Sequence, residues 1–177
     1  AVRSCQCTIA NEFKGLASRL ADLEQRYISS GESSKVASII DIRTDIEQIA
    51  RPFLTLTGVI RLSESDQVNL VVSLLNRLYH QSCVAQLSGD SNTFEVVTRV
   101  LTGALQTSIR PVARWILAGE CSSSNDFFII GNNPDCELGR LWSDRYTLRQ
   151  RTDGVVAIPE FFRPFVDRIF APVSYTH

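Results

Sequence analysis

Apolar residues in the first part of the chain recur at alternating steps of four and three, which is the spacing of one face of an α-helix. The first run ends at the polar triplet Ser29-Ser30-Gly31, where glycine suits the left-handed cap that closes many helices. The stripe consists of Ile9, Phe13, Leu16, Leu20, Leu23 and Tyr27. We therefore expect one long amphipathic helix as the first element.

Three more helical runs follow, separated by short polar segments. They cover residues 33–62, with Ser33-Ser34 as the cap, residues 68–84 and residues 92–118. The third helix is apolar on more than one side, so we expect it to lie inside a bundle with neighbours on both flanks. The segment Ser88-Gly89-Asp90-Ser91 is expected to close the third helix and to cap the fourth.

Two prolines fall inside these helical runs. Pro52 lies in the later part of the second helix, and Pro111 lies in the fourth. A proline has no backbone N–H and crowds the preceding turn. We therefore expect a kink or a break near Ala50-Arg51 and a bend at Pro111.

Helical periodicity stops at Gly119, and shorter elements follow. Residues 126–130 read as a short buried strand, and residues 141–149 as a second extended segment that could pair with it as a small hairpin. A last helix is expected to begin at Pro159. The predicted fold is mainly α: an elongated antiparallel four-helix bundle over residues 1–120. Residues 121–177 supply the extended segments and the terminal helix, packed on the bundle within one domain.

Composition narrows the function. The chain has 177 residues, 44% of them hydrophobic and 21% charged, as is usual for a soluble globular domain, and a formal net charge of -1. Acidic residues interrupt the basic cluster formed by Arg140, Arg145, Arg149 and Arg151, so we expect no nucleic-acid partner. We predict neither a signal peptide nor a membrane-inserted helix. Because the chain lacks an initial Met, we expect it to be a fragment of a longer protein.

Candidate chemistry is sparse. The five cysteines have no repeated spacing, which favours a reducing compartment over a disulfide framework. Cys5-Gln6-Cys7 and His80 with Cys83 lack the second pair that a zinc site needs, so no metal site is predicted. Glu120 and Asp126 have no nucleophile beside them, and the chain has no phosphate-binding glycine motif. We predict no cofactor and no catalytic residue. An enzyme using Cys83 or His80 would require a pocket with a third polar partner.

The order of aromatic motifs points to a family. Trp115, Gly119-Glu120 and residues 126–129, which read Asp-Phe-Phe-Ile, resemble the W-x-x-x-G … E-F-F-I segment of the gamma-tubulin complex component family, the spindle pole body component family of fungi. The upstream residues 74–79, which read Leu-Leu-Asn-Arg-Leu-Tyr, and the turn Gly89-Asp90 are similar to the motifs that precede this segment in the family.

Further motifs extend the resemblance over nearly the whole chain. Trp142, Tyr146 and Leu148 are similar to the W-x-x-x-Y-x-L segment of the family, residues 159–161 to its Pro-x-Phe helix, and residues 20–24 to its L-x-x-L-E helix. The chain departs from the family where residues 122–125 replace an Asp-Pro-like dipeptide and where residues 170–173 replace a continuation toward Gly-Lys. The resemblance therefore suggests a divergent member, matching the later part of the family's N-terminal motif.

The resemblance implies a structural role. Members of this family stand side by side through N-terminal helical bundles in a ring that templates a microtubule, and their C-terminal halves hold gamma-tubulin. The implied partners are other gamma-tubulin complex components, and gamma-tubulin through a part of the parent chain beyond this sequence. The implied location is the microtubule organizing centre of the cytoplasm, at a centrosome or spindle pole body.

The resemblance also singles out residues, here as core positions that bind no ligand. They are Leu20, Leu23, Leu75, Tyr79, Trp115, Gly119, Phe127, Phe128, Trp142, Tyr146, Pro159 and Phe161. No partner-binding residue is predicted. The alternative functions that remain are a helical-bundle tether or adaptor of membrane traffic, which would lack the Trp-Gly-Phe-Phe order, and the enzyme considered above.

Overall fold

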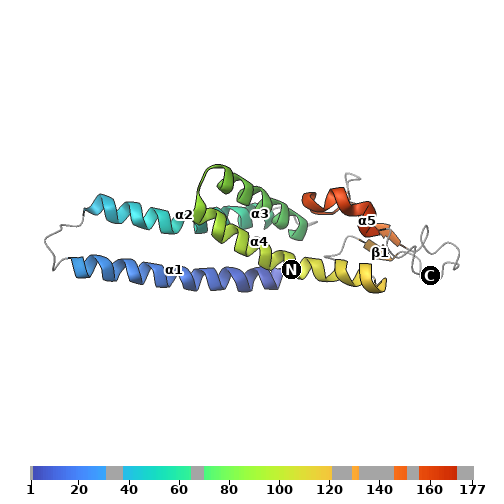
Figure 1. Ribbon diagram of the computed structural model, residues 1–177, viewed down its shortest axis with the longest axis horizontal. Helices are drawn as coiled ribbons and strands as arrows, with labels where there is room; N and C mark the ends of the chain where they lie inside the picture. Colours follow the sequence, from blue (N-terminus) through green and yellow to red (C-terminus); the bar gives the residue numbers. More distant parts are fainter. Residues whose placement is uncertain are drawn as a thin grey trace.

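The computed structural model describes residues 2–30, 38–64, 70–120, 129–131, 146–150 and 156–170. The long helices are α1 (Val2–Ser30), α2 (Ile39–Glu64), α3 (Leu70–Leu87) and α4 (Ser91–Ala118). They are followed by strands β1 (Ile129–Gly131) and β2 (Tyr146–Leu148), the 3-10 helix η3 (Glu160–Phe165) and the short helix α5 (Val166–Phe170). The prediction of a mainly helical, elongated bundle is confirmed (Figure 1).

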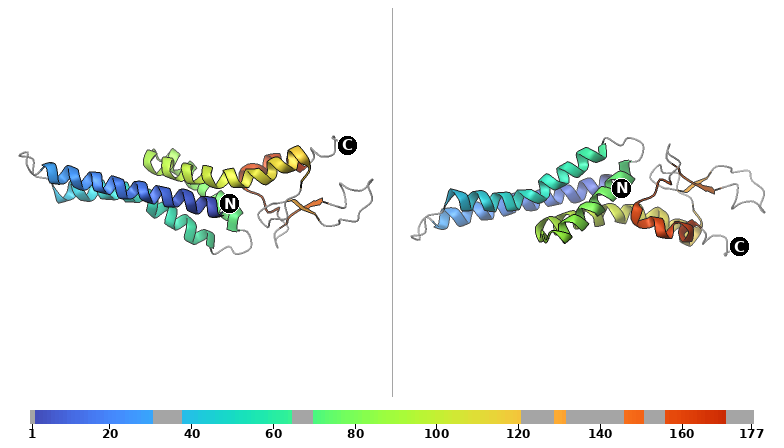
Figure 2. Two further views of the ribbon diagram at one scale, coloured as in Figure 1. Left: turned by 90° about the horizontal axis from the view of Figure 1, so that it is seen from below. Right: turned by 90° about the horizontal axis from the view of Figure 1, so that it is seen from above.

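The bundle is long because its helices are staggered. Figures 1 and 2 show α1 and α2 side by side at one end, where they extend beyond α3 and α4, while α5 and the strands lie at the other end. We call the paired outer ends of α1 and α2, around Tyr27 and Asp45, the α1–α2 arm. The Tyr27 hydroxyl donates a hydrogen bond of 3.0 Å to Oδ2 of Asp45 across this arm.

The main core lies where α2, α3 and α4 meet. Its buried members are Leu56, Val59, Leu74, Leu75, Leu78, Val96, Val97, Val100, Leu101 and Ala104. As predicted, α3 contacts α2 on one flank and α4 on the other, but it is not enclosed, because Tyr79, Val84 and Leu87 are exposed. Burial of these side chains is the main favourable term in holding the helices together.

Helix α1 packs against α4 at a close crossing. A Cβ atom at Gly103 of α4 would collide with the side chain of Thr8, whose Cβ would lie only 3.2 Å away. Beside the crossing, Nε of Arg99 lies 3.0 Å from Oε1 of Glu12 and so links the two helices by an ion pair. Glycine at position 103 is therefore explained by the approach of α1.

The prolines bend the helices without breaking them. Helix α2 continues through Pro52, so the alternative of a break near Ala50-Arg51 is wrong. Pro52 itself is buried, and packing holds the helix together although one backbone hydrogen bond cannot form. Figure 2 shows α2 changing direction along its length, and Figure 1 shows the same for α4, which contains Pro111.

Both ends of α4 are closed by capping residues. Asp90 is the N-cap of α4, within the segment predicted to cap it: Oδ1 accepts a 3.0 Å hydrogen bond from the backbone N–H of Thr93. Gly119 caps the other end with φ 65°, and its N–H donates to the carbonyl of Trp115. The predicted caps at Gly31 and at Ser33-Ser34 lie outside the described residues.

The C-terminal elements form a small antiparallel pair, as predicted. Ile129 pairs with Leu148 and Gly131 with Tyr146 in the sheet of β1 and β2. The last helix differs from the prediction because it begins as the 3-10 helix η3 after Pro159 and becomes α-helical only from Val166. Pro164 lies within η3, where its missing N–H removes one α-helical hydrogen bond.

Candidate interaction surface

The end of α4 is joined to the C-terminal elements by a cluster that we call the Trp115 seam. Its buried members are Val112, Trp115, Ile158 and Ile169, and the side chains packed against them are Tyr146, Leu148, Val156, Phe162, Val166 and Phe170. Three separate stretches of the chain, in α4, β2 and α5, therefore meet on one indole ring. The sequence places Trp115 on the inward stripe of α4, which is why its side chain points away from solvent.

The geometry of this seam fixes the indole in one position. The indole Nε1–H of Trp115 donates a 2.7 Å hydrogen bond to the carbonyl oxygen of Ile169, in the last turn of α5. The ring of Tyr146 meets the indole edge to face, with centroids 4.9 Å apart, and the ring of Phe170 stacks on it at 6.4 Å. Trp115 has no exposed surface, so the seam closes over the indole.

A second contact joins the C-terminal elements to α3. The backbone N–H of Glu160 donates a 2.8 Å hydrogen bond to Oδ1 of Asn76. The ring of Phe161 lies between those of Tyr79 and Phe162, with centroid distances of 5.4 and 4.8 Å. Helix η3 is thus held against α3 by both a polar and an aromatic contact.

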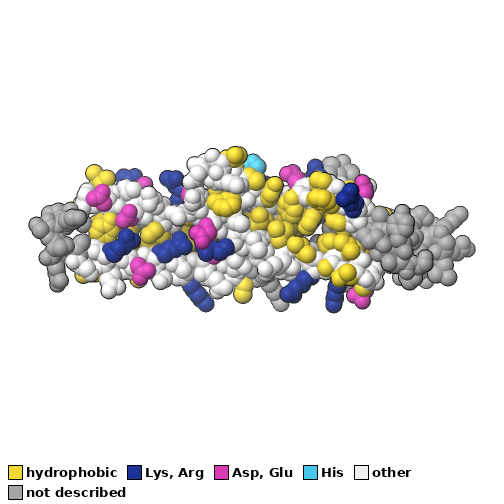
Figure 3. Space-filling view, in the orientation of Figure 1, with side chains coloured by type: hydrophobic (Ala, Val, Ile, Leu, Met, Phe, Trp, Pro, Cys, Tyr) yellow, Lys and Arg dark blue, Asp and Glu magenta, His cyan; other side chains and the backbone are white. Residues whose placement is uncertain are grey.

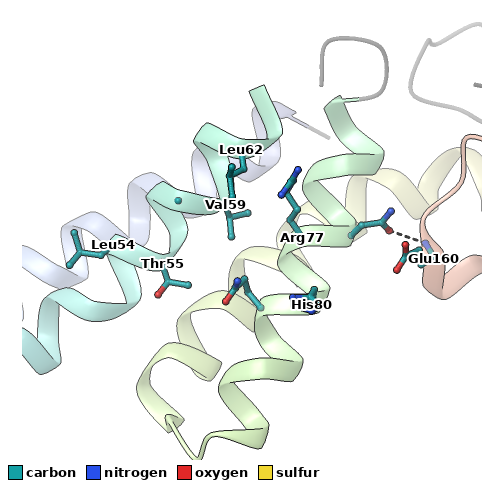
Figure 4. Close-up of a pocket in the computed structure, with 10 residues that line it drawn as sticks. Leu54, Thr55, Val59, Leu62, Arg77, His80 and Glu160 are labelled. Atoms are coloured by element: carbon teal, nitrogen blue, oxygen red, sulfur yellow. Dashed lines mark hydrogen bonds between the residues drawn. The ribbon is translucent and has the colours of Figure 1, made fainter. Parts of the chain in front are cut away.

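A cleft of about 520 Å³, which we call the α2–α3 groove, opens beside this contact. One wall is formed by α2 with Leu54, Thr55, Gly58, Val59 and Leu62, and the other by α3 with Asn76, Arg77, His80 and Gln81; Glu160 lies at one end. Figure 4 shows the side chain of Arg77 projecting from α3 toward α2, whose labelled residues Val59 and Leu62 lie opposite. The groove therefore combines an apolar wall with a polar one.

The described residues do not assemble a reactive centre. In the described ranges, no three side chains of His, Cys, Asp and Glu come together as metal ligands. His80 faces the α2–α3 groove, whereas Cys7 is exposed and Cys83 half-buried on other parts of the helices. Glu120 is exposed, and Asp126 lies outside the described residues. His80 and Cys83 lie three residues apart on α3, and of the two only His80 lines the α2–α3 groove.

The perturbed acidic group of this structure belongs to a helix cap. The backbone N–H of Thr93 lowers the pKa of Asp90, and the Thr93 hydroxyl and the charge of Arg51 act in the same direction, although partial burial opposes them. At the α1–α2 arm, partial burial and the hydrogen bond to Asp45 raise the pKa of Tyr27. Both shifts come from structural contacts that hold helix ends or helix pairs in place.

Many large apolar side chains remain on the outside of the bundle. They are Phe13, Leu20, Ile28, Ile39, Ile40, Ile46, Leu54, Leu62, Tyr79, Val84, Leu87, Ile109, Ile116, Leu117 and Phe165. Figure 3 shows hydrophobic side chains gathered over the region of α3, α4 and α5, whereas charged side chains of both signs are interspersed over the α1–α2 arm. Exposed apolar surface of this extent is typical of proteins that bind other proteins.

The sequence was compared with models of known protein families. The family model described as gamma tubulin complex component N-terminal matches residues 2–172, which is nearly the whole sequence. The chain belongs to the gamma-tubulin complex component family. A comparison with curated proteins found no match. The family is one of structural components of a complex, connected with microtubule nucleation and the cytoskeleton.

In this gamma-tubulin complex component, most of the described motif residues lie inside. Leu23, Leu75, Trp115 and Pro159 are buried, and Tyr146 and Phe161 are half-buried. Gly119 is the left-handed cap of α4. Phe127, Phe128 and Trp142 lie outside the described residues. The Trp115 seam brings Trp115 and Tyr146 together, and the contact with η3 brings Tyr79 and Phe161 together.

Two of the predicted core residues are corrected by the structure. Leu20 is 39% exposed and Tyr79 43% exposed. Leu20 precedes the buried Leu23 by three residues, so the two side chains point in directions about 60° apart around the helix axis, and only that of Leu23 is covered. Tyr79 contacts Phe161 with its ring but remains at the edge of the bundle.

Sequence reasoning missed the residues of the α2–α3 groove and the residues that complete the seam. Leu54, Gly58 and Leu62 are spaced by four along the side of α2 that faces away from the core, and this spacing was the available signal. The contact of Ile158 and Ile169 with Trp115 gave no such signal, because Trp115 is far away in the sequence. Among the described helices, none has the length and apolar character needed to cross a membrane.

Proposed function

We propose that this chain is a scaffold segment that makes lateral contacts with neighbouring gamma-tubulin complex components in a ring that templates microtubule nucleation. In this proposal it binds no cofactor and catalyses no reaction. Gamma-tubulin would be held by another part of the parent protein, and the assembly would act at a microtubule organizing centre of the cytoplasm. The family match over residues 2–172 supports the membership on which the proposal builds.

The observation that carries the proposal is the outward apolar surface of a bundle whose own core is already filled. Ile39, Ile40 and Leu87 are largely exposed, although the inward stripes of their helices are buried. Exposed apolar side chains of this kind lower the free energy of association by roughly 25 cal/mol for each Å² that a partner covers. A lateral contact of standard size buries about 1,600 Å² in total.

The rigidity of the bundle supports the same role. A side-by-side ring needs subunits that keep their shape, and the contacts between α4 and α5 and between α3 and η3 hold the C-terminal elements on the bundle. We therefore also propose that residues 1–120 and 121–177 fold as one unit. The closed Trp115 seam supports a shaping role for that tryptophan.

Deletion within the parent protein tests the proposal. Removing residues 1–177 should abolish side-by-side association with other gamma-tubulin complex components, while co-purification with gamma-tubulin should persist. Association can be measured by mass photometry of the purified complexes. If the truncated parent assembled as well as the intact protein, the lateral role would be refuted.

A further inference from the structure

The glycines inside the long helices differ in what surrounds them. A glycine within a helix costs roughly 0.5–1 kcal/mol of stability relative to alanine. Gly103 has a reason within the chain, because α1 with Thr8 approaches it closely. In contrast, a Cβ atom added at Gly58 or at Gly15 would have no other atom within 4 Å. No packing contact among the described residues therefore requires glycine at position 58.

Position 58 lies in the middle of an exposed apolar stripe. Leu54 and Leu62 lie one helical turn to either side of Gly58 and are 72% and 55% exposed. All three residues line the α2–α3 groove. Side chains four apart lie on one face of a helix, and the missing Cβ at the centre allows another backbone to approach closely.

The opposite wall of the groove carries a cation without a carboxylate partner. Among the described residues, Arg77 forms no ion pair; its Nε lies 3.4 Å from the hydroxyl of Ser73. Glu160 lies at one end of the groove, where its backbone N–H is bound to Asn76 (Figure 4). A partner segment that complements this groove would have apolar side chains along one face and a carboxylate beside them.

An amphipathic α-helix meets these requirements. Leu54 and Leu62 are separated by about 12 Å along the helix axis, at roughly 1.5 Å per residue, so two to three turns of a partner helix match them. Helices that pack directly have axes about 8–10 Å apart, and a glycine at the crossing permits the shorter distance. Helix-in-groove binding through side chains at such spacing is a common mode of recognition.

We propose that the α2–α3 groove receives an amphipathic helix of a neighbouring gamma-tubulin complex component, with its backbone against Gly58, apolar side chains between Leu54 and Leu62, and a carboxylate on Arg77. This inference rests on the proposed lateral role and specifies one surface that serves it. Charge complementarity with Arg77 distinguishes this occupant from a purely apolar helix. Glu160 favours a basic residue on the partner where the helix leaves the groove.

A pair of matched glycine variants tests the groove in the intact parent protein. Gly58→Leu fills the point of closest approach and should weaken association with the other components at least tenfold, measured as a dissociation constant by mass photometry. Gly15→Leu is the control, because Gly15 also lies inside an exposed helical turn with no atom within 4 Å. Unchanged association of Gly58→Leu, or equal weakening by Gly15→Leu, would overturn the proposal.

Two further variants separate docking from folding. Gly58→Ala should leave the thermal unfolding temperature of the parent protein unchanged or raise it, because alanine favours helix, while association weakens severalfold. Arg77→Glu should weaken association about tenfold, and Arg77→Lys should retain most of it. If Arg77→Glu associated as tightly as the wild type, no carboxylate would be bound there.

Cross-linking identifies the occupant. A photoreactive amino acid in place of Leu54, introduced into the parent protein within assembled complexes, should cross-link to a helix of a different component that carries an acidic residue. Cross-links to a second copy of this chain, to another segment of the same chain, or to nothing would refute the proposed occupant. If the wild-type protein associates with the other components and the groove variants associate equally well, the groove is not the contact surface, although the lateral role stands. If the wild-type protein does not associate at all, the lateral role itself is refuted.

Discussion

Trp115→Phe tests how the C-terminal elements of this chain are held on the helical bundle. Phenylalanine keeps an aromatic ring in contact with Tyr146 and Phe170, but it cannot donate the hydrogen bond that Nε1 of Trp115 gives to the carbonyl oxygen of Ile169. The substitution therefore removes a buried hydrogen bond of 2.7 Å and leaves the space of the larger ring incompletely filled.

The expected loss follows from these two effects. An unsatisfied buried carbonyl costs about 1–3 kcal/mol, and the incompletely filled space adds roughly 1 kcal/mol. We expect Trp115→Phe to lower the free energy of unfolding by about 2–4 kcal/mol, a large share of the roughly 5–15 kcal/mol that stabilises a typical domain. Trp115→Ala, which removes the ring altogether, should cost about 3–5 kcal/mol.

Urea unfolding followed by far-UV circular dichroism measures this loss, and Leu117→Ala provides the control. Leu117 lies on the same helix but is 85% exposed, so its truncation should change the free energy of unfolding by less than about 0.5 kcal/mol. A Trp115→Phe change as small as that of the control would refute the role assigned to the seam. Hydrogen exchange adds a local measurement. In Trp115→Ala, the exchange rates of the amides of residues 158–170 should increase over those of the wild type by more than the rates of the α3 amides do. An equal increase in both regions would show that the whole bundle had loosened.

Three other substitutions address caps and crossings. Gly119→Ala should destabilise the chain by about 1 kcal/mol in urea unfolding, because φ at this cap is 65°; no loss would contradict the cap. Asp90→Ala should cost about 1 kcal/mol at pH 7. Because the pKa of Asp90 is lower in the folded state, its contribution is present above the unfolded pKa and is lost as pH falls through the folded pKa. The difference between wild type and Asp90→Ala should therefore shrink on acidification, and a constant difference would contradict this linkage. Gly103→Ala should fail to gain the stability that Gly15→Ala gains, as thermal unfolding can show, because α1 must move away from the added methyl group. Equal gains in both variants would contradict the close crossing.

Local patterns determined most of the helical architecture in advance. The steps of three and four predicted where α1, α3 and α4 lie, and the polar segment before α4 contained its actual cap, Asp90. Gly119 ends α4 as expected. These features depend on neighbours within one or two turns, which a single sequence displays directly. The order of the aromatic motifs indicates the same family that the match over residues 2–172 shows.

The tertiary structure alone decided which apolar residues are covered. Leu23 is buried whereas Leu20, on the same stripe of α1, is 39% exposed, and the spacing of the stripe alone does not distinguish the two. The sequence marked Trp115 as a core residue, yet its hydrogen bond to Ile169 joins residues 54 positions apart, and no local pattern encodes such a contact. The same holds for the groove: the sequence places Leu54 and Gly58 on one face of α2, and only the packing of α2 beside α3 leaves that face open opposite Arg77.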